Sequence, residues 1–171
     1  ALEIARHLIL EEQIDSLILC VKDDTLLFQW ELEIEKWLSK FSIDNFLIRK
    51  QFNKFKELDA FLLSPENSIL ILRQHHNPDL ERLLNEFATE NEAQRCLMIH
   101  DEVHNMGARQ KTELPRNHKG FGYVLGLSAT SNRGEFDEEG NAYILEEIGE
   151  TIFTYTLEDA IRDGDALCEF N

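Results

Sequence analysis

Short apolar runs alternate with longer amphipathic segments along this chain, and this alternation limits its possible folds more than any other feature. The apolar runs have the length of buried strands and lie at residues 16–21, 46–48, 68–72, 96–99 and 123–127. Amphipathic helices are expected between them, at residues 2–9, 25–39, 55–63 and 78–87. Strands that alternate with helices of these lengths indicate βαβ units. The sequence therefore predicts an α/β fold, a three-layer sandwich whose sheet is mostly parallel and carries helices on both faces.

The last part of the chain adds a predicted helix at residues 142–148 and a short strand at 151–155. A further helix is expected at 156–164, where Thr156 can accept a hydrogen bond from an early amide and Gly164 suits a left-handed stop. The 171 residues have the length of one ordinary domain. The first helix has no cap and no preceding strand, so we expect a further segment upstream of Ala1.

The composition restricts the class of protein. A hydrophobic content of 43% fits a globular chain. No apolar run approaches the roughly 18 residues of a membrane span, and the first residues do not resemble a signal peptide. The cysteines are far apart and lie in or beside apolar segments, which predicts buried reduced thiols at Cys20, Cys96 and Cys168. We therefore expect a cytoplasmic protein without membrane contact.

The net charge of −16 argues against nucleic-acid binding by simple electrostatics, because phosphate neutralisation needs a basic surface. Residues 49–56 differ from the rest, since four basic residues alternate there with Phe52 and Phe55. We expect this stretch to be a solvated helix face with its aromatic rings buried. A phosphate-contacting surface is the alternative interpretation.

Two adjacent acids, Asp101 and Glu102, come one residue after the apolar run at 96–99, and His104 comes two residues later. In open α/β sheets, ligands bind outside the carboxyl ends of such strands. One acid there can hold Mg²⁺ while the other acts on a water molecule. Chance is the competing explanation in so acidic a chain. The second acid pair, Asp137 and Glu138, has no apolar run before it and is expected in a solvated turn.

The segment Ser128-Ala129-Thr130 leaves another apolar run and turns into small hydroxyl residues. Taken alone, such residues most often form an ordinary turn. Their separation from the acid pair suits a neighbouring strand of the same sheet, which would bring the hydroxyl groups beside His104.

Together these segments resemble the DExH box and the Ser-Ala-Thr motif of superfamily 2 helicases and translocases. Residues 17–21 followed by 26–30 resemble the strand and Gln-Trp helix of that family's motif Ia. Residues 101–108 resemble a bacterial and phage branch, and 136–141 with 155–164 resemble the exit of the first RecA-like motor domain. The resemblance covers nearly the whole chain in the right order.

The resemblance implies an ATP hydrolase that uses ATP and Mg²⁺. Asp101 would hold the Mg²⁺ that bridges the ATP phosphates, and Glu102 would orient and deprotonate the attacking water. His104 would sense the γ-phosphate. The resemblance also implies that His104 acts on Ser128, Ala129 and Thr130, and that these three residues couple hydrolysis to movement on nucleic acid.

The partner implied by the resemblance is nucleic acid, DNA rather than RNA, together with a second RecA-like domain in the same polypeptide. Thr25, Gln29 and Arg73 would lie near the phosphates of the bound strand. Asp23 and Asp24 replace the Pro-Thr usual in motif Ia, and two acids are unexpected beside a nucleic-acid backbone.

The resemblance is incomplete, because the phosphate loop Gly-x-x-x-x-Gly-Lys-Ser/Thr is missing and none of the eight glycines precedes a lysine. Residues 1–10 resemble the helix that would follow this loop. We therefore expect residues 1–171 to be one incomplete motor domain, without the phosphate loop or the second motor domain, and inactive by itself.

Two rival interpretations remain from the residues alone. A non-catalytic α/β interaction module derived from a helicase domain is supported by the missing phosphate loop. A zinc hydrolase is suggested by His100 and His104, four residues apart beside carboxylates, but it would require a continuous helix across residues predicted to form a strand.

Overall fold

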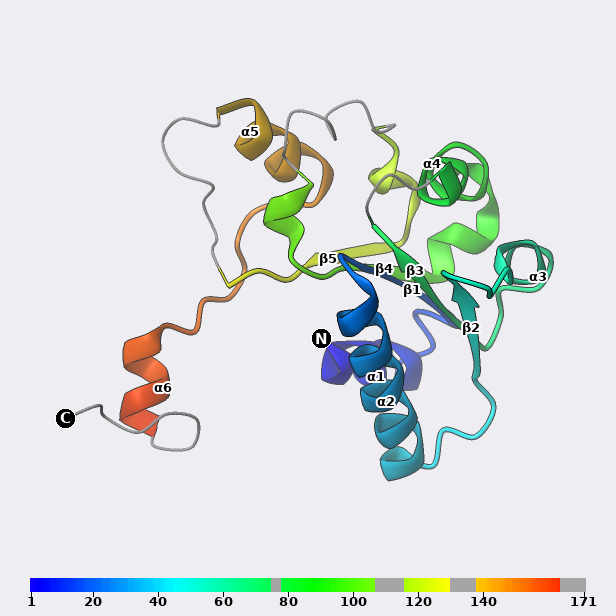
Figure 1. The fold of residues 1–171 in the computed structure, drawn as a ribbon, viewed down its shortest axis with the longest axis horizontal. Coiled ribbons are helices and arrows are strands. Elements are labelled where there is room, and N and C mark those ends of the chain that lie inside the picture. Colours follow the sequence, from blue (N-terminus) through cyan, green and yellow to red (C-terminus); the bar gives the residue numbers. More distant parts are fainter. Residues whose placement is uncertain (75–77, 107–115, 130–137, 164–171) are drawn as a thin grey trace.

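A five-stranded parallel sheet forms the centre of the protein (Figure 1). The computed structural model describes residues 1–74, 78–106, 116–129 and 138–163. The strand order is β2-β3-β1-β4-β5, and every neighbouring pair is parallel. The strands are β1 Ser16–Val21, β2 Leu47–Gln51, β3 Ser68–Arg73, β4 Cys96–His100 and β5 Tyr123–Gly126. The predicted α/β fold is confirmed.

Helices cover both faces of this sheet (Figure 1). The α-helices are α1 Leu2–Leu10, α2 Asp24–Phe41, α3 Leu58–Leu63, α4 Pro78–Asn85, α5 Glu138–Glu147 and α6 Leu157–Asp163. Short 3-10 helices are η1 Phe87–Thr89, η2 Asn91–Arg95, η3 Val103–Asn105 and η4 His118–Gly120. The result is the expected three-layer sandwich.

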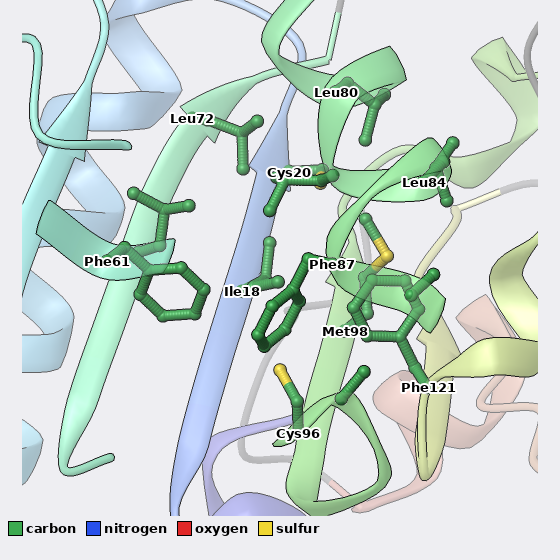
Figure 2. Packing of buried hydrophobic residues seen from close by; sticks show 14 of the residues in the cluster. Ile18, Cys20, Phe61, Leu72, Leu80, Leu84, Phe87, Cys96, Met98 and Phe121 are labelled. Atoms are coloured by element: carbon green, nitrogen blue, oxygen red, sulfur yellow. The ribbon is translucent and has the colours of Figure 1, made fainter. Parts of the chain in front are cut away.

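Alternate residues of the central strands form two separate hydrophobic layers. On one face, Ile18 and Met98 pack with Phe61 of α3 and Leu84 of α4, around a group of rings and aliphatic side chains drawn in Figure 2. On the other face, residues such as Leu19 pack with α1 and α2. Burial of β1 and β4 on both faces explains why their sequences are continuous apolar runs and not alternating ones.

The parallel register brings the carboxyl ends of the strands to one edge of the sheet. Cys20 of β1 is paired with His100 of β4, and His100 is paired with Gly126 of β5. Val21 of β1 is paired with Arg73 of β3 on the other side. Residues that follow these strands therefore share one edge.

The predicted helix in the basic stretch at residues 49–56 is wrong. Residues up to Gln51 belong to β2, and a turn follows in which the Phe55 amide donates to the Phe52 carbonyl, 2.9 Å away. Phe52 is buried, as predicted for its ring. The helix α3 begins only at Leu58.

The predicted strand at residues 151–155 is also wrong. The segment pairs with no strand of the described residues, and Ile152 and Phe153 are 82% and 76% exposed. Thr156 caps α6 as predicted, because its Oγ1 accepts from the Asp159 amide at 3.1 Å. Gly164 lies outside the described residues.

The thiols of Cys20 and Cys96 are free and buried, as predicted. Burial raises the pKa of both thiols, that of Cys96 to about 12. Cys168 lies outside the described residues.

Candidate active site

The acid pair lies at the carboxyl end of the interior strand β4, where the sequence predicted it. Three backbone hydrogen bonds hold this turn: Asp101 N–H to the Cys20 carbonyl at 2.9 Å, Leu127 N–H to the His100 carbonyl at 2.8 Å, and Val103 N–H to the Leu127 carbonyl at 2.8 Å. The turn is thereby fastened to the strands on both sides of β4. Asp101 and Glu102 remain partly exposed to solvent.

The backbone of Glu102 is left-handed, with φ 53° and ψ 48°. A side chain other than glycine costs about 1 kcal/mol or more in this conformation. At this left-handed residue the chain turns away from the direction of β4. The short helix η3, which carries His104, begins at the next residue. The sequence offered no glycine or asparagine to signal this turn.

Asp101 is oriented by Trp30, a residue that the sequence analysis did not place in the site. The Trp30 Nε1–H donates to Asp101 Oδ2 across 2.7 Å, and the Glu102 amide donates to Asp101 Oδ1 across 3.1 Å. Trp30 lies in α2, whose first turn is capped by Asp23 Oδ1 accepting from the Leu26 amide at 3.1 Å. The helical period predicted which face of α2 meets the sheet, but not that the indole reaches a carboxylate.

His104 connects the acid pair to the segment after β5. Its Nδ1 lies 2.9 Å from Ser128 Oγ, although the two residues are 24 positions apart, and 3.1 Å from Glu102 Oε2. The predicted meeting of His104 and Ser128 is therefore present. Ala129 follows and is exposed, and Thr130 lies outside the described residues.

The three side chains suggested for nucleic-acid contact lie on α2 and at the end of β3. Thr25 and Gln29 are exposed on α2. Arg73 forms an ion pair with Asp24, and its Nη2 lies 3.4 Å from Asn53 Oδ1. The two unexpected acids thus have structural partners: Asp23 caps α2, and Asp24 neutralises Arg73.

A buried polar group lies behind the acid pair. His118 Nδ1 lies 3.0 Å from Glu147 Oε2, which also accepts from the His118 amide at 3.2 Å. The His118 ring meets the His100 ring edge-on, with centroids 5.0 Å apart, and Gln74 Nε2 lies 3.5 Å from His100 Nδ1. Burial lowers the pKa of His118, against the opposite effect of the Glu147 carboxylate. Sequence reasoning missed His118 and Glu147, since their pairing spans 29 residues.

The arrangement does not suit a zinc hydrolase. His100 is the fully buried last residue of β4, and His104 lies in η3, so no continuous helix carries both. Within the part of the chain that the structure describes, no three His, Cys, Asp or Glu side chains converge as a metal-binding group. The zinc interpretation was wrong.

Oxygen ligands fit a magnesium site of a different kind. Mg²⁺ is usually held by one or two carboxylates together with water and substrate phosphates, not by a full protein cage. Asp101 and Glu102 supply carboxylate oxygens at the mouth of the sheet, and each keeps partial solvent access. The donor set thus suits a metal that arrives with a polyphosphate.

Comparison with known proteins agrees with this geometry. The family model described as type III restriction enzyme, res subunit, matches residues 1–133, which include strands β1 to β5 and the acid pair. The chain belongs to this family. At family level the res-subunit match identifies a helicase-like ATPase domain of superfamily 2, of a class that binds nucleic acid. A search of curated proteins gave no significant match. None of the helices in the described ranges has both the length and the apolar character needed to cross a bilayer.

Proposed function

We propose that this chain is part of the first motor domain of an ATP-dependent DNA helicase or translocase of superfamily 2. The observation that supports this most is the contact of His104 with both Glu102 and Ser128, at 3.1 Å and 2.9 Å, beside the acid-bearing end of β4. This contact connects Glu102, a residue suited to phosphate chemistry, with Ser128, the first residue of the Ser-Ala-Thr segment. The remaining parts of the motor, a phosphate loop and a second RecA-like domain, would be supplied by sequence outside these 171 residues.

In this proposal, ATP supplies the phosphoryl group, and the carboxylates would hold the Mg²⁺ that accompanies it. Asp101 Oδ2 is held by the Trp30 indole, so its carboxylate is presented in a fixed orientation to the metal. Glu102 then accepts a proton from the attacking water, and its left-handed backbone directs it away from the strand. Both residues act by position and charge, which is the main requirement of phosphoryl transfer.

His104 provides the coupling step. Its Nδ1 lies 2.9 Å from the Ser128 hydroxyl and 3.1 Å from a Glu102 carboxylate oxygen, so a movement of Glu102 would alter the contact with Ser128. The Ser128-Ala129-Thr130 segment begins two residues after β5 and would pass this change to nucleic acid. Thr25, Gln29 and Arg73 would contact the bound strand.

The test is ATP hydrolysis by the longer protein that contains this domain, with and without single-stranded DNA. Glu102→Gln keeps the size of the side chain but replaces a carboxylate oxygen by an NH2 donor and so removes the base, and turnover should fall about 100-fold or more. His104→Ala should retain basal turnover better than its stimulation by DNA. Equal turnover of the wild type and Glu102→Gln would refute the assigned role of Glu102.

A non-catalytic module is the second candidate, because this chain has no phosphate loop. The coding sequence immediately before Ala1 separates the two. Gly-Lys-Thr or Gly-Lys-Ser at the end of a glycine-rich loop there supports the motor, and its absence supports the module.

A further inference from the structure

An exposed aromatic ring lies on α2 beside the turn that follows β2. Phe28 is 49% exposed, and its ring meets the buried ring of Phe52 edge-on, with centroids 5.8 Å apart and planes at 87°. Phe52 in turn contacts Phe55, at 5.7 Å between centroids. The Phe28 ring therefore packs against the buried Phe52 ring, which Phe55 contacts in turn, and part of the Phe28 ring stays open to solvent.

Positive charge lies next to these rings despite the acidity of the whole chain. Lys54 and Lys56 are exposed and form no ion pair with any described residue. The Lys54 ammonium lies 5.5 Å from the centre of the Phe55 ring. Their position after β2 puts these lysines at the same edge of the sheet as Arg73.

Four acids of α2 and of the turn after β2 have hydrogen-bond or ion-pair partners. Glu31 is paired with Lys50, Asp24 with Arg73, and Glu57 Oε2 accepts from the Lys50 amide at 2.6 Å. Asp23 caps α2. Asp23 and Glu57 keep their negative charge in these hydrogen bonds, whereas Lys54 and Lys56 have no ion-pair partner among the described residues, so their ammonium groups can bind the phosphates of a ligand.

We propose that Phe28, Lys54 and Lys56 form a stacking platform for single-stranded nucleic acid, called here the Phe28 platform. A base stacks on the Phe28 ring, and the two ammonium groups contact phosphates on either side of it. Thr25 and Gln29, close to Phe28 on α2, supply hydrogen-bonding groups to the same strand. The inference rests on the proposed function and adds to it a contact with bases, which single strands expose and duplexes hide.

The experiment measures fluorescence anisotropy of a labelled oligo(dT) at low ionic strength with the 171-residue chain. A second probe is an oligomer of the same length made of abasic sites, which keeps the phosphates and lacks the bases. Phe28→Ala should weaken oligo(dT) binding roughly 5- to 150-fold, the range for loss of one stacked base. It should change binding of the abasic probe by less than twofold, and Phe28→Trp should restore oligo(dT) binding.

Leu32→Ala is the matched control. Leu32 lies one turn further along α2 and is 56% exposed, but it offers no aromatic ring on which a base can stack, so its truncation should leave oligo(dT) binding unchanged. Lys54→Gln with Lys56→Gln should weaken both probes and reduce the salt dependence of binding. Lys36→Gln is the control for the loss of positive charge. Lys36 lies on α2 and is paired with Glu33, so its replacement should weaken binding much less.

The outcomes are distinct. Absence of oligo(dT) binding by the wild type, equal binding of the two probes, or equal effects of Phe28→Ala and Leu32→Ala would each overturn the Phe28 platform. Weaker oligo(dT) binding by Phe28→Ala, with unchanged binding of the abasic probe, supports the Phe28 platform. This holds whether or not Glu102→Gln changes ATP hydrolysis in the longer protein. Failure of the motor proposal is therefore seen in turnover, and failure of the platform in oligonucleotide binding.

Discussion

The Trp30 indole donates a hydrogen bond to the Asp101 carboxylate across 2.7 Å, which joins α2 to the end of β4. These residues are 71 positions apart in the chain. Because α2 begins shortly after β1 and Asp101 directly follows β4, this one contact ties the segment that resembles motif Ia to the proposed magnesium ligand.

Trp30→Phe removes this donor and keeps an aromatic side chain. We expect the free energy of unfolding of the chain, measured with urea, to fall by about 1–2 kcal/mol, since the bond is to a charged acceptor. In a protein that joins this domain to the proposed phosphate loop and second motor domain, the Mg²⁺ concentration for half-maximal ATP hydrolysis should rise roughly 10-fold. Trp37→Phe is the control, because the buried Trp37 Nε1 has no hydrogen-bond partner among the described residues, and the Mg²⁺ requirement should not change. An equal shift in both variants would contradict the assigned role of Trp30.

The left-handed backbone at Glu102 predicts that stability and activity respond in opposite directions. Glu102→Gly should relieve the strained conformation and raise the free energy of unfolding by about 1 kcal/mol, while it abolishes ATP hydrolysis in the longer protein. Glu12→Gly tests the backbone effect alone, because Glu12 has φ 54° outside the site. It should stabilise the chain to a similar extent and leave hydrolysis unchanged. A loss of stability in Glu102→Gly would show that the glutamate side chain stabilises the turn.

The depressed pKa of His118 predicts a loss of stability in acid. The buried ring stays neutral in the folded chain, whereas the unfolded chain binds a proton with a pKa near about 6.5. The unfolded state therefore binds a proton at higher pH than the folded state does. The free energy of unfolding should fall as pH drops below about 6.5. The fall is at most about 1.4 kcal/mol per pH unit, and it stops at the pKa of the folded state.

His118→Asn should flatten this part of the stability profile, measured by urea unfolding between pH 7.5 and pH 5 (about 2.5 pH units). His7→Asn is the control, because His7 is exposed on α1. A profile as steep in His118→Asn as in the wild type would assign the effect to other groups.

The Arg73–Asp24 ion pair predicts that removal of the acid strengthens nucleic-acid binding. Asp24→Asn releases the guanidinium for a phosphate, so affinity for oligo(dT) should rise and the slope of log affinity against log salt should steepen by about 0.7. Glu33→Gln removes the same charge elsewhere on α2, where Glu33 pairs with Lys36, and should change the slope much less. Equal effects would indicate net charge alone and would remove Arg73 from the proposed contacts.

The strand ends could be predicted from the sequence because burial on both faces requires apolar runs, and the polar residues after them mark the edge. The meeting of His104 with Ser128 followed from parallel neighbouring strands. The contact of Trp30 with Asp101 could not be predicted, because helical period indicates a face of α2 and not the reach of one indole.

Two local patterns were misleading for physical reasons. Phe52 and Phe55 are three positions apart, a spacing that a tight turn satisfies as well as a helix. Residues 151–155 have the composition of a strand, but a strand also needs a hydrogen-bonding neighbour, and a local pattern cannot supply one.

The three backbone hydrogen bonds around Asp101 have a practical consequence for enzymology. Main-chain groups of Cys20, His100 and Leu127 survive any substitution of the side chains they support. Replacements at the two acids therefore change the side chains of the proposed site and leave these three main-chain hydrogen bonds in place.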